Sequence, residues 1–234
     1  MRPMRHRRVA LILFSLSATL LLALTSLPVH AASTLVQQNN IGCLGCSSTL
    51  SVSFTNSAAG GDVIVVGVAV GEASFALSSI TDSLGSSFTQ AVKSNDTFPL
   101  TVYLYYATLS TGGPDVITAT FSAAAPAESV YIYEVSGVTT VGAANATNSG
   151  TGTSISTSPL PFQTGSFLLA IIGTNSFGAT TTPGPGFTLI TNNSPNGFTF
   201  AQYSTTSVST PTDFQASTNP VASWAEDAIV LSPS

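Results

Sequence analysis

The sequence predicts an all-β protein, an antiparallel β-sandwich of about a dozen strands. Short runs rich in Val, Ile, Thr, Phe and Tyr recur along the chain and are bounded by Gly, Pro, Asn, Asp or Ser, which is the pattern of strands and turns. Apolar residues make up 44% of the 234 residues and charged residues only 6%, so a core can form and charge-driven disorder is excluded. No window has the periodicity of an amphipathic helix.

The individual strands follow from the pattern of apolar residues. Leu50, Val52 and Phe54 alternate with serines, which predicts a half-buried strand with its apolar side chains on one face. Val63–Val70 is apolar throughout and rich in β-branched residues, so we expect it in the middle of a sheet, covered on both faces. Further strands are expected at 75–80, 88–92, 100–108, 116–121, 129–135, 167–172, 187–191, 198–205, 214–218 and 227–231.

The N-terminus has the pattern of a secretory signal peptide over residues 1–31. A cationic segment, 1–8, precedes an apolar stretch, 9–27, and the small-x-small sequence 29–31 follows Pro28. This predicts a secreted, extracellular or cell-surface protein with no membrane span after signal cleavage. A retained membrane anchor is the alternative, since 9–27 is nearly long enough to cross a bilayer.

Cleavage would leave 203 residues (234 − 31) whose only basic side chain is Lys93. All ten acidic residues remain, and neither histidine does. Nucleic-acid binding needs several cationic side chains that displace counterions from phosphates, so this class is excluded. The surface must be built from hydroxyl and amide groups, and no cofactor is expected.

The rest of the chain divides into an extended N-terminal segment, 32–49, and a β-sandwich, 50–234. Its halves, 50–138 and 162–234, share four short stretches in the same order, which favours an internal duplication over chance similarity. The segment between them, 139–161, has the composition of a linker, although its Thr/Ser alternation also suits an edge strand. The halves would be two sheets of one sandwich or two tandem modules. The shared stretches are 61–65 with 165–169, 88–89 with 187–188, 106–110 with 203–207, and Asp115 with Asp213.

Several stretches of the first half carry a resemblance to a known family. They are 61–66, 80–89, 103–107, 116–121 and 133–138. With the rest of residues 50–234, they resemble Ser/Thr-rich β-sandwich modules, of jelly-roll or immunoglobulin-like type, from uncharacterised secreted and cell-surface proteins of bacteria and archaea. The resemblance implies a role at a surface and supplies no catalytic residues.

Cys43 and Cys46 form a conspicuous short motif, Cys-Leu-Gly-Cys. In an exported protein, two cysteines in a Gly-containing loop are expected to form a disulfide, which would pin the N-terminal segment against the first strand. A thioredoxin-like redox site is the alternative, but no helix start follows to lower the pKa of a thiolate. Structural zinc would need two further ligands, so no metal site is predicted here.

Acid–base catalysis would have to use carboxyl groups, and the candidates are Glu128, Glu134, Glu226 and Asp227. Glu134 shares a face with apolar neighbours in its predicted strand, an environment that raises the pKa of a carboxyl group and suits a general acid. The alternative is a strand-end glutamate that reaches solvent or caps a loop. Serine-based hydrolysis lacks a histidine base. We therefore expect no catalysis.

Four tyrosines are the candidate ligand face. Tyr103 and Tyr105 share one face of a predicted strand, and Tyr131 and Tyr133 share one face of another. If the two strands are neighbours, the rings form a ladder. An exposed ladder would offer flat faces on which sugar rings stack, whereas a buried one would be ordinary aromatic packing.

Two oxygen-rich turns, 82–85 and 95–97, could each donate one or two calcium ligands. Calcium needs six or more oxygens, and an Asx turn is the simpler interpretation of Asp82 followed by Gly85. The sequence therefore predicts no metal.

These observations together predict a non-catalytic, exported structural or adhesion module. We expect the extended segment 32–40 to add as a strand to a neighbouring subunit, so that the partner is the protein itself in a filament or oligomer. The alternative is a carbohydrate-binding module that holds surface glycans on its tyrosine face.

Overall fold

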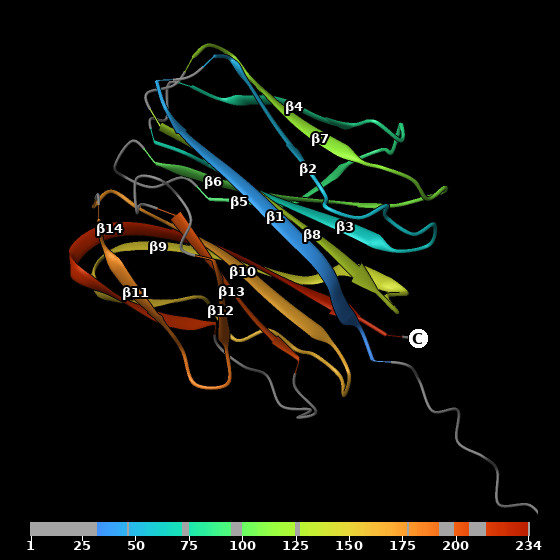
Figure 1. Cartoon of the computed structure of the whole chain (residues 1–234). Helices are drawn as coiled ribbons and strands as arrows, with labels where there is room; N and C mark the ends of the chain where they lie inside the picture. Colours follow the sequence, from blue (N-terminus) through green and yellow to red (C-terminus); the bar gives the residue numbers. More distant parts are fainter. Residues whose placement is uncertain are drawn as a thin grey trace, which may run out of the picture. The chain divides into compact units, whose positions relative to one another are not determined.

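The computed structural model contains fourteen antiparallel strands and no helix in the residues that it describes (Figure 1). These residues are 32–45, 47–71, 75–94, 100–124, 127–176, 178–191, 199–205 and 214–233. The predicted all-β fold is confirmed, whereas the predicted signal peptide, 1–31, and Cys46 lie outside the described residues. The strands are β1 (Thr34–Leu44), β2 (Thr49–Ser53), β3 (Val63–Val70), β4 (Leu77–Asp82), β5 (Thr89–Lys93), β6 (Thr101–Thr108), β7 (Val116–Phe121), β8 (Ala127–Ser136), β9 (Thr140–Ser156), β10 (Phe167–Thr174), β11 (Thr180–Pro183), β12 (Thr188–Thr191), β13 (Thr199–Thr205) and β14 (Gln215–Ser232).

The two strand patterns singled out in the sequence form as predicted. In β2, Leu50 and Val52 are buried while the residues between and beside them are exposed, and Phe54 is buried just after the strand. All eight residues of β3 are buried, and β3 is the middle strand of its sheet. Period-two alternation and a continuous apolar run thus correspond to one and two covered faces, respectively.

The strands form three sheets. The central sheet has the order β1-β8-β3-β6-β5, the three-stranded sheet β2-β7-β4, and the C-terminal sheet β11-β14-β10-β13-β12, with β9 also paired to β14. Figure 1 shows the three-stranded sheet above the central sheet and the C-terminal sheet below it. One hydrophobic cluster joins the central sheet to the three-stranded sheet, and another joins it to the C-terminal sheet. The core therefore lies on both faces of the central sheet.

The two halves of the chain repeat one strand order. The order β8-β3-β6-β5 in the central sheet corresponds to β14-β10-β13-β12 in the C-terminal sheet. The register repeats as well, because Val65 pairs with Tyr106 in the first half and Leu169 pairs with Tyr203 in the second. The sequence comparison had aligned the same pairs, so the strand pairing agrees with an internal duplication.

Two long strands account for the difference between the halves. β14 pairs with β11 through residues 216–219 and with β10 through residues 224–231, and so takes the places of β7 and β8. β9 pairs with both parts of β14 and takes the places of β1 and β2. The prediction of a linker at 139–161 is therefore wrong, and the edge-strand alternative is correct. Thr and Ser suit such a strand because its polar side chains face solvent while Ile155 is buried.

The repeats pack closely where Gly67 of β3 faces Ile171 of β10. A Cβ atom at position 67 would lie 2.7 Å from Ile171 Cδ1, so only glycine fits without movement of that side chain. Gly67 pairs with Tyr131 of β8, and Ile171 pairs with Asp227 of β14, so the two positions are equivalent in the repeat. Contact between equivalent positions is the arrangement expected near a two-fold axis.

Candidate functional site

The four predicted ligand-face tyrosines do not share a face. β3 lies between β6 and β8, so the strands that carry the two pairs are not neighbours. Tyr103 and Tyr105 face the three-stranded sheet, whereas Tyr131 and Tyr133 face the C-terminal sheet and are fully buried. The predicted ladder is therefore wrong. Packing, the favoured interpretation of these residues, holds for Tyr103, Tyr131 and Tyr133.

Tyr105 is the one member of this set that is partly accessible. The main-chain nitrogen of Leu77 in β4 donates to Tyr103 Oη (3.4 Å), which places the edge of the three-stranded sheet over Tyr103. Tyr105 lies two residues further along the same face of β6 and is half-buried, and its Oη donates to Gln90 Oε1 (2.8 Å) on β5. Burial raises the pKa of the Tyr105 phenol, and the neighbouring Tyr103 raises it further, so the hydroxyl stays a hydrogen-bond donor.

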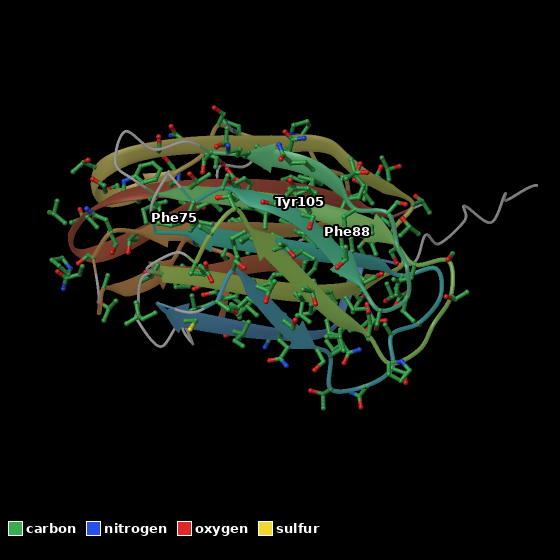
Figure 2. The ribbon with its side chains drawn as sticks, turned by 90° about the horizontal axis from the view of Figure 1, so that it is seen from above. Phe75, Phe88 and Tyr105 are labelled. Atoms are coloured by element: carbon green, nitrogen blue, oxygen red, sulfur yellow. The ribbon has the colours of Figure 1, made fainter. Side chains whose placement is uncertain are left out.

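An aromatic strip, defined here as Phe75, Phe88 and Tyr105, runs along this side of the protein. All three residues are half-buried, and Figure 2 shows Tyr105 between the two phenylalanines. At the same side, Lys93 Nζ lies 5.1 Å from the centroid of the Tyr103 ring, a cation–π contact. Flat apolar rings with a hydroxyl, an amide and an ammonium group beside them are the groups on which sugar rings stack and to which sugar hydroxyls bond.

Glu134, the favoured acid–base candidate, is part of a buried clamp. Its Oε2 accepts from Gln37 Nε2 in β1 (2.6 Å), and its Oε1 accepts from the main-chain nitrogen of Ala59 in the β2–β3 connection (2.7 Å). Gln37 also exchanges hydrogen bonds with the main chain of Asn56. Glu134 is only 1% exposed, so the clamp holds β8, β1 and this connection together. The geometry supports a structural role for Glu134.

Asp62 adds a second carboxyl group to this clamp. Burial raises the pKa of Asp62, and a hydrogen bond with Glu134 and the negative charge of that residue raise it further. A protonated Asp62 can donate to the Glu134 carboxylate, which lets two acidic groups lie together without a cation. The sequence contained no signal for this pair, because Asp62 and Glu134 are brought together only by the pairing of β3 with β8.

Asp227 lies between the two repeats. It points into the same cluster as Ala225 and Ile229, between the central and C-terminal sheets, and its Oδ2 accepts from the main-chain nitrogen of Ser94 (3.2 Å) at the end of β5. Burial raises the pKa of Asp227 to about 7, although hydrogen bonds from Thr147 and Ser94 act in the opposite direction. Glu226, the next residue, points to the opposite face and is also buried.

Buried acidic residues have apolar counterparts in the other repeat. The matched registers put Glu128 at the position of Trp224, Glu134 at that of Val230, Glu226 at that of Val130 and Asp227 at that of Tyr131. The fold therefore accommodates an apolar side chain at each of these positions, and it does not itself require the carboxyl groups.

Among the described residues, all acidic side chains are turned inward. Asp115, Glu128, Glu134, Glu226 and Asp227 are buried, and Asp62 and Asp82 are half-buried. Lys93 is the one basic residue in this part of the chain. Apart from Lys93 and the accessible parts of Asp62 and Asp82, the described surface is consequently built from hydroxyl, amide and apolar groups. It contains no cluster of three or more His, Cys, Asp or Glu side chains and no helix with the length and apolarity needed to cross a membrane.

The segment 32–40, predicted to reach a neighbouring subunit, is engaged within its own chain. It forms most of β1, which pairs with β8 from Thr34 to Leu44. Asn39 Nδ2 also donates to the main-chain oxygen of Ser53 (2.8 Å). β1 completes the central sheet and covers the outer edge of β8, so this segment is not a free tail in the structure. The other edge of β1 pairs with no strand in the described residues, and Val36, Ile41 and Leu44 are the exposed large apolar side chains of β1.

The predicted disulfide lies at the end of this strand. Cys43 is near the end of β1 and packs against the cluster under the three-stranded sheet, and no cysteine in the described residues is free. Cys46 lies outside the described residues, so its pairing with Cys43 stays a prediction.

Comparisons of the chain with protein-family models, with curated proteins and with solved structures found no match.

Proposed function

We propose that this chain is an exported, non-catalytic structural or adhesion module that associates with a second copy of itself through the outer edge of β1. One observation carries the proposal: β1 is an uncharged edge strand of eleven residues with exposed apolar side chains. Val36 is 51% exposed, Ile41 37% and Leu44 56%. An edge strand presents a row of unpaired main-chain donors and acceptors, and long apolar edges pair readily with other chains.

The two edges of the central sheet differ in how they are protected. β5, at the far edge, has five residues, a register irregularity and the charged Lys93, all of which discourage pairing. β1 has neither a charge nor a proline, and its one irregularity, between Leu35 and Gln37, lies near its beginning. Antiparallel pairing of β1 with β1 of a second copy would join two central sheets and close a symmetric dimer.

The test is the oligomeric state of residues 32–234, measured by size-exclusion chromatography with light scattering over a range of concentrations. The double variant Val36→Lys with Leu44→Lys should be a monomer, because charges at an edge oppose pairing. Val221→Lys is the matched control: Val221 is 63% exposed but lies on β14, so this variant should dimerise like the parent. A parent protein that is monomeric throughout, or a double variant that still dimerises, contradicts the proposal.

The export part of the proposal rests on the N-terminal sequence pattern and has its own test. N-terminal sequencing of the protein recovered from a culture medium should begin at Ala32. Recovery of the protein only in the membrane fraction, with Met1 to Ala31 still attached, would instead support the retained anchor.

Carbohydrate binding is the second candidate function, favoured by the partly accessible aromatic strip. Because Tyr103 and Tyr131 are buried, Tyr105 is the tyrosine to replace in a binding test. Tyr105→Ala should abolish glycan binding on an array, whereas Tyr105→Phe should keep most of it, because the ring that stacks is retained. Equal binding by the parent and Tyr105→Ala would exclude the strip as the ligand site.

A further inference from the structure

Two acidic residues from distant parts of the sequence meet at one end of the three-stranded sheet. β4 ends at Asp82, and β7 begins directly after Asp115. Ser83 joins the two strand ends: its Oγ is within donating distance of Asp115 Oδ1 (3.1 Å) and the main-chain oxygen of Pro114 (3.2 Å), and it accepts from the main-chain nitrogen of Val116 (3.0 Å). Asp82 Oδ1 accepts from the main-chain nitrogen of Ser86 (2.7 Å). Each carboxyl group thus has one oxygen held in place by the protein.

The second oxygen of each group has no hydrogen-bond partner in the described residues. Asp82 Oδ2 and Asp115 Oδ2 are both buried, and Asp115 as a residue is only 2% exposed. A buried carboxylate oxygen without a partner is unfavourable, and two anions near each other add repulsion. Burial raises the pKa of Asp115 and the charge of Asp82 raises it further, whereas hydrogen bonds with Ser83 and Val116 act in the opposite direction. The one basic side chain of the described chain, Lys93, lies over the ring of Tyr103 instead.

The second repeat shows that the fold does not need a carboxyl group here. The main-chain oxygen of Asp115 accepts from the nitrogen of Phe54 (3.2 Å), and the main-chain oxygen of Phe214 accepts in the same way from Thr157 (3.1 Å). Phe214 is therefore the counterpart of Asp115, and it is fully buried in an apolar cluster. The same position holds a packed ring in one repeat and, in the other, a carboxyl group with one oxygen that lacks a partner in the described residues.

We propose that Asp82 Oδ2 and Asp115 Oδ2 bind a Ca²⁺ ion at this end of the three-stranded sheet. A divalent cation would supply the missing partner of both oxygens and cancel the repulsion between the two groups. Water and main-chain carbonyls of the 82–86 turn would complete the coordination shell. Such a mixed, adaptable set of oxygens suits Ca²⁺ better than Mg²⁺, which demands near-ideal octahedral geometry. With only two carboxylates, we expect a Kd of about 0.1–1 mM, as in extracellular modules.

The site is tested on residues 32–234 by thermal unfolding in EDTA and in increasing CaCl₂ at constant ionic strength. Saturating Ca²⁺, at about 100 times Kd, should raise Tm by about 5 to 10 °C, whereas Mg²⁺ should have a smaller effect. Asp82→Asn and Asp115→Asn keep the oxygen that accepts the existing hydrogen bond but remove the charge, so each should lose the Ca²⁺ response and remain folded in EDTA. Asp62→Asn is the control and should respond like the parent.

Two results would overturn the proposal. One is a parent protein whose Tm does not respond to Ca²⁺, or a response that Asp82→Asn and Asp115→Asn share with it. The other comes from isothermal titration calorimetry, which needs no variant to fold: titration of CaCl₂ into the parent should show saturable binding of one ion, and its absence excludes the site. Dimerisation through β1 does not enter either measurement.

Discussion

Replacement of Asp227 by Asn should remove much of the pH dependence of stability between pH 4 and pH 8. The carboxyl group is fully buried between the two repeats, and burial raises its pKa from 3.8 to about 7. The folded state therefore holds this proton more tightly than the unfolded state. The contribution of Asp227 to the free energy of unfolding is fully present below its unfolded pKa of 3.8. This contribution is lost as the pH rises through the folded pKa of about 7.

The size of the effect follows from the difference between the two pKa values. The difference between about 7 and 3.8 is about 3 pKa units, and one unit corresponds to about 1.4 kcal/mol. The free energy of unfolding should thus fall by about 4 kcal/mol from pH 4 to pH 8 through this residue alone. Asn is uncharged at both pH values and can still accept from Ser94, so Asp227→Asn should be more stable than the parent at pH 8 by a similar amount.

The assay is urea unfolding at a series of pH values, followed by the fluorescence of Trp224. This is the one tryptophan of the chain, and it is only 6% exposed. Asp62→Asn serves as the control, because Asp62 is half-buried and should leave most of the pH dependence in place. Parallel pH profiles for the parent and Asp227→Asn, or a parent that is more stable at pH 8 than at pH 5, would refute the reasoning.

Three further predictions concern packing and hydrogen bonds, all measured as free energies of unfolding in urea. Glu134→Ala removes the shared acceptor of Gln37 Nε2 and the main-chain nitrogen of Ala59 and should cost about 2 to 4 kcal/mol; a loss below about 1 kcal/mol would show that the clamp is not structural. Gly67→Ala should cost about 1 to 3 kcal/mol in the parent but far less in an Ile171→Ala background, and equal costs in the two backgrounds would contradict the close approach of the repeats. Tyr133→Phe removes a buried hydroxyl that has no partner in the described residues, so stability should stay the same or rise by up to about 1 kcal/mol, and a clear loss would reveal a bound water.

Strands were predictable where apolar side chains decide the structure. The continuous run of β3 and the alternation in β2 each correspond to strands with the predicted burial, because a pleated strand exposes its two faces with a strict period of two. The composition of β9 suits a solvated linker as well as an edge strand, so the sequence alone does not decide between them. Its 17 residues are a strand because the long partner β14 provides hydrogen bonds along its whole length. That partner cannot be read from the local sequence.

The candidate sites depended on strand order, which the sequence does not contain. The tyrosine ladder required β6 and β8 to be neighbours, but β3 separates them and puts the two pairs on opposite faces. Asp82 and Asp115 are far apart in the chain, and only the pairing of β4 with β7 brings them together. The internal repeat was the exception, since three of the four shared stretches already contained the register of the second sheet. The fourth was displaced by one residue, because Asp115 corresponds to Phe214 and not to Asp213.

The close approach of Gly67 to Ile171 makes the chain resemble two subunits fused by a tether. β8 ends at Ser136 and β9 begins at Thr140, so a very short connection delivers the second repeat to the first at a high effective concentration. Either repeat alone would expose to water the apolar face that now packs against the other repeat, and other proteins with an apolar surface would bind there. Fusion buries that apolar face within the chain before other molecules can bind to it. Contacts with other molecules are then left to the edges of the sheets.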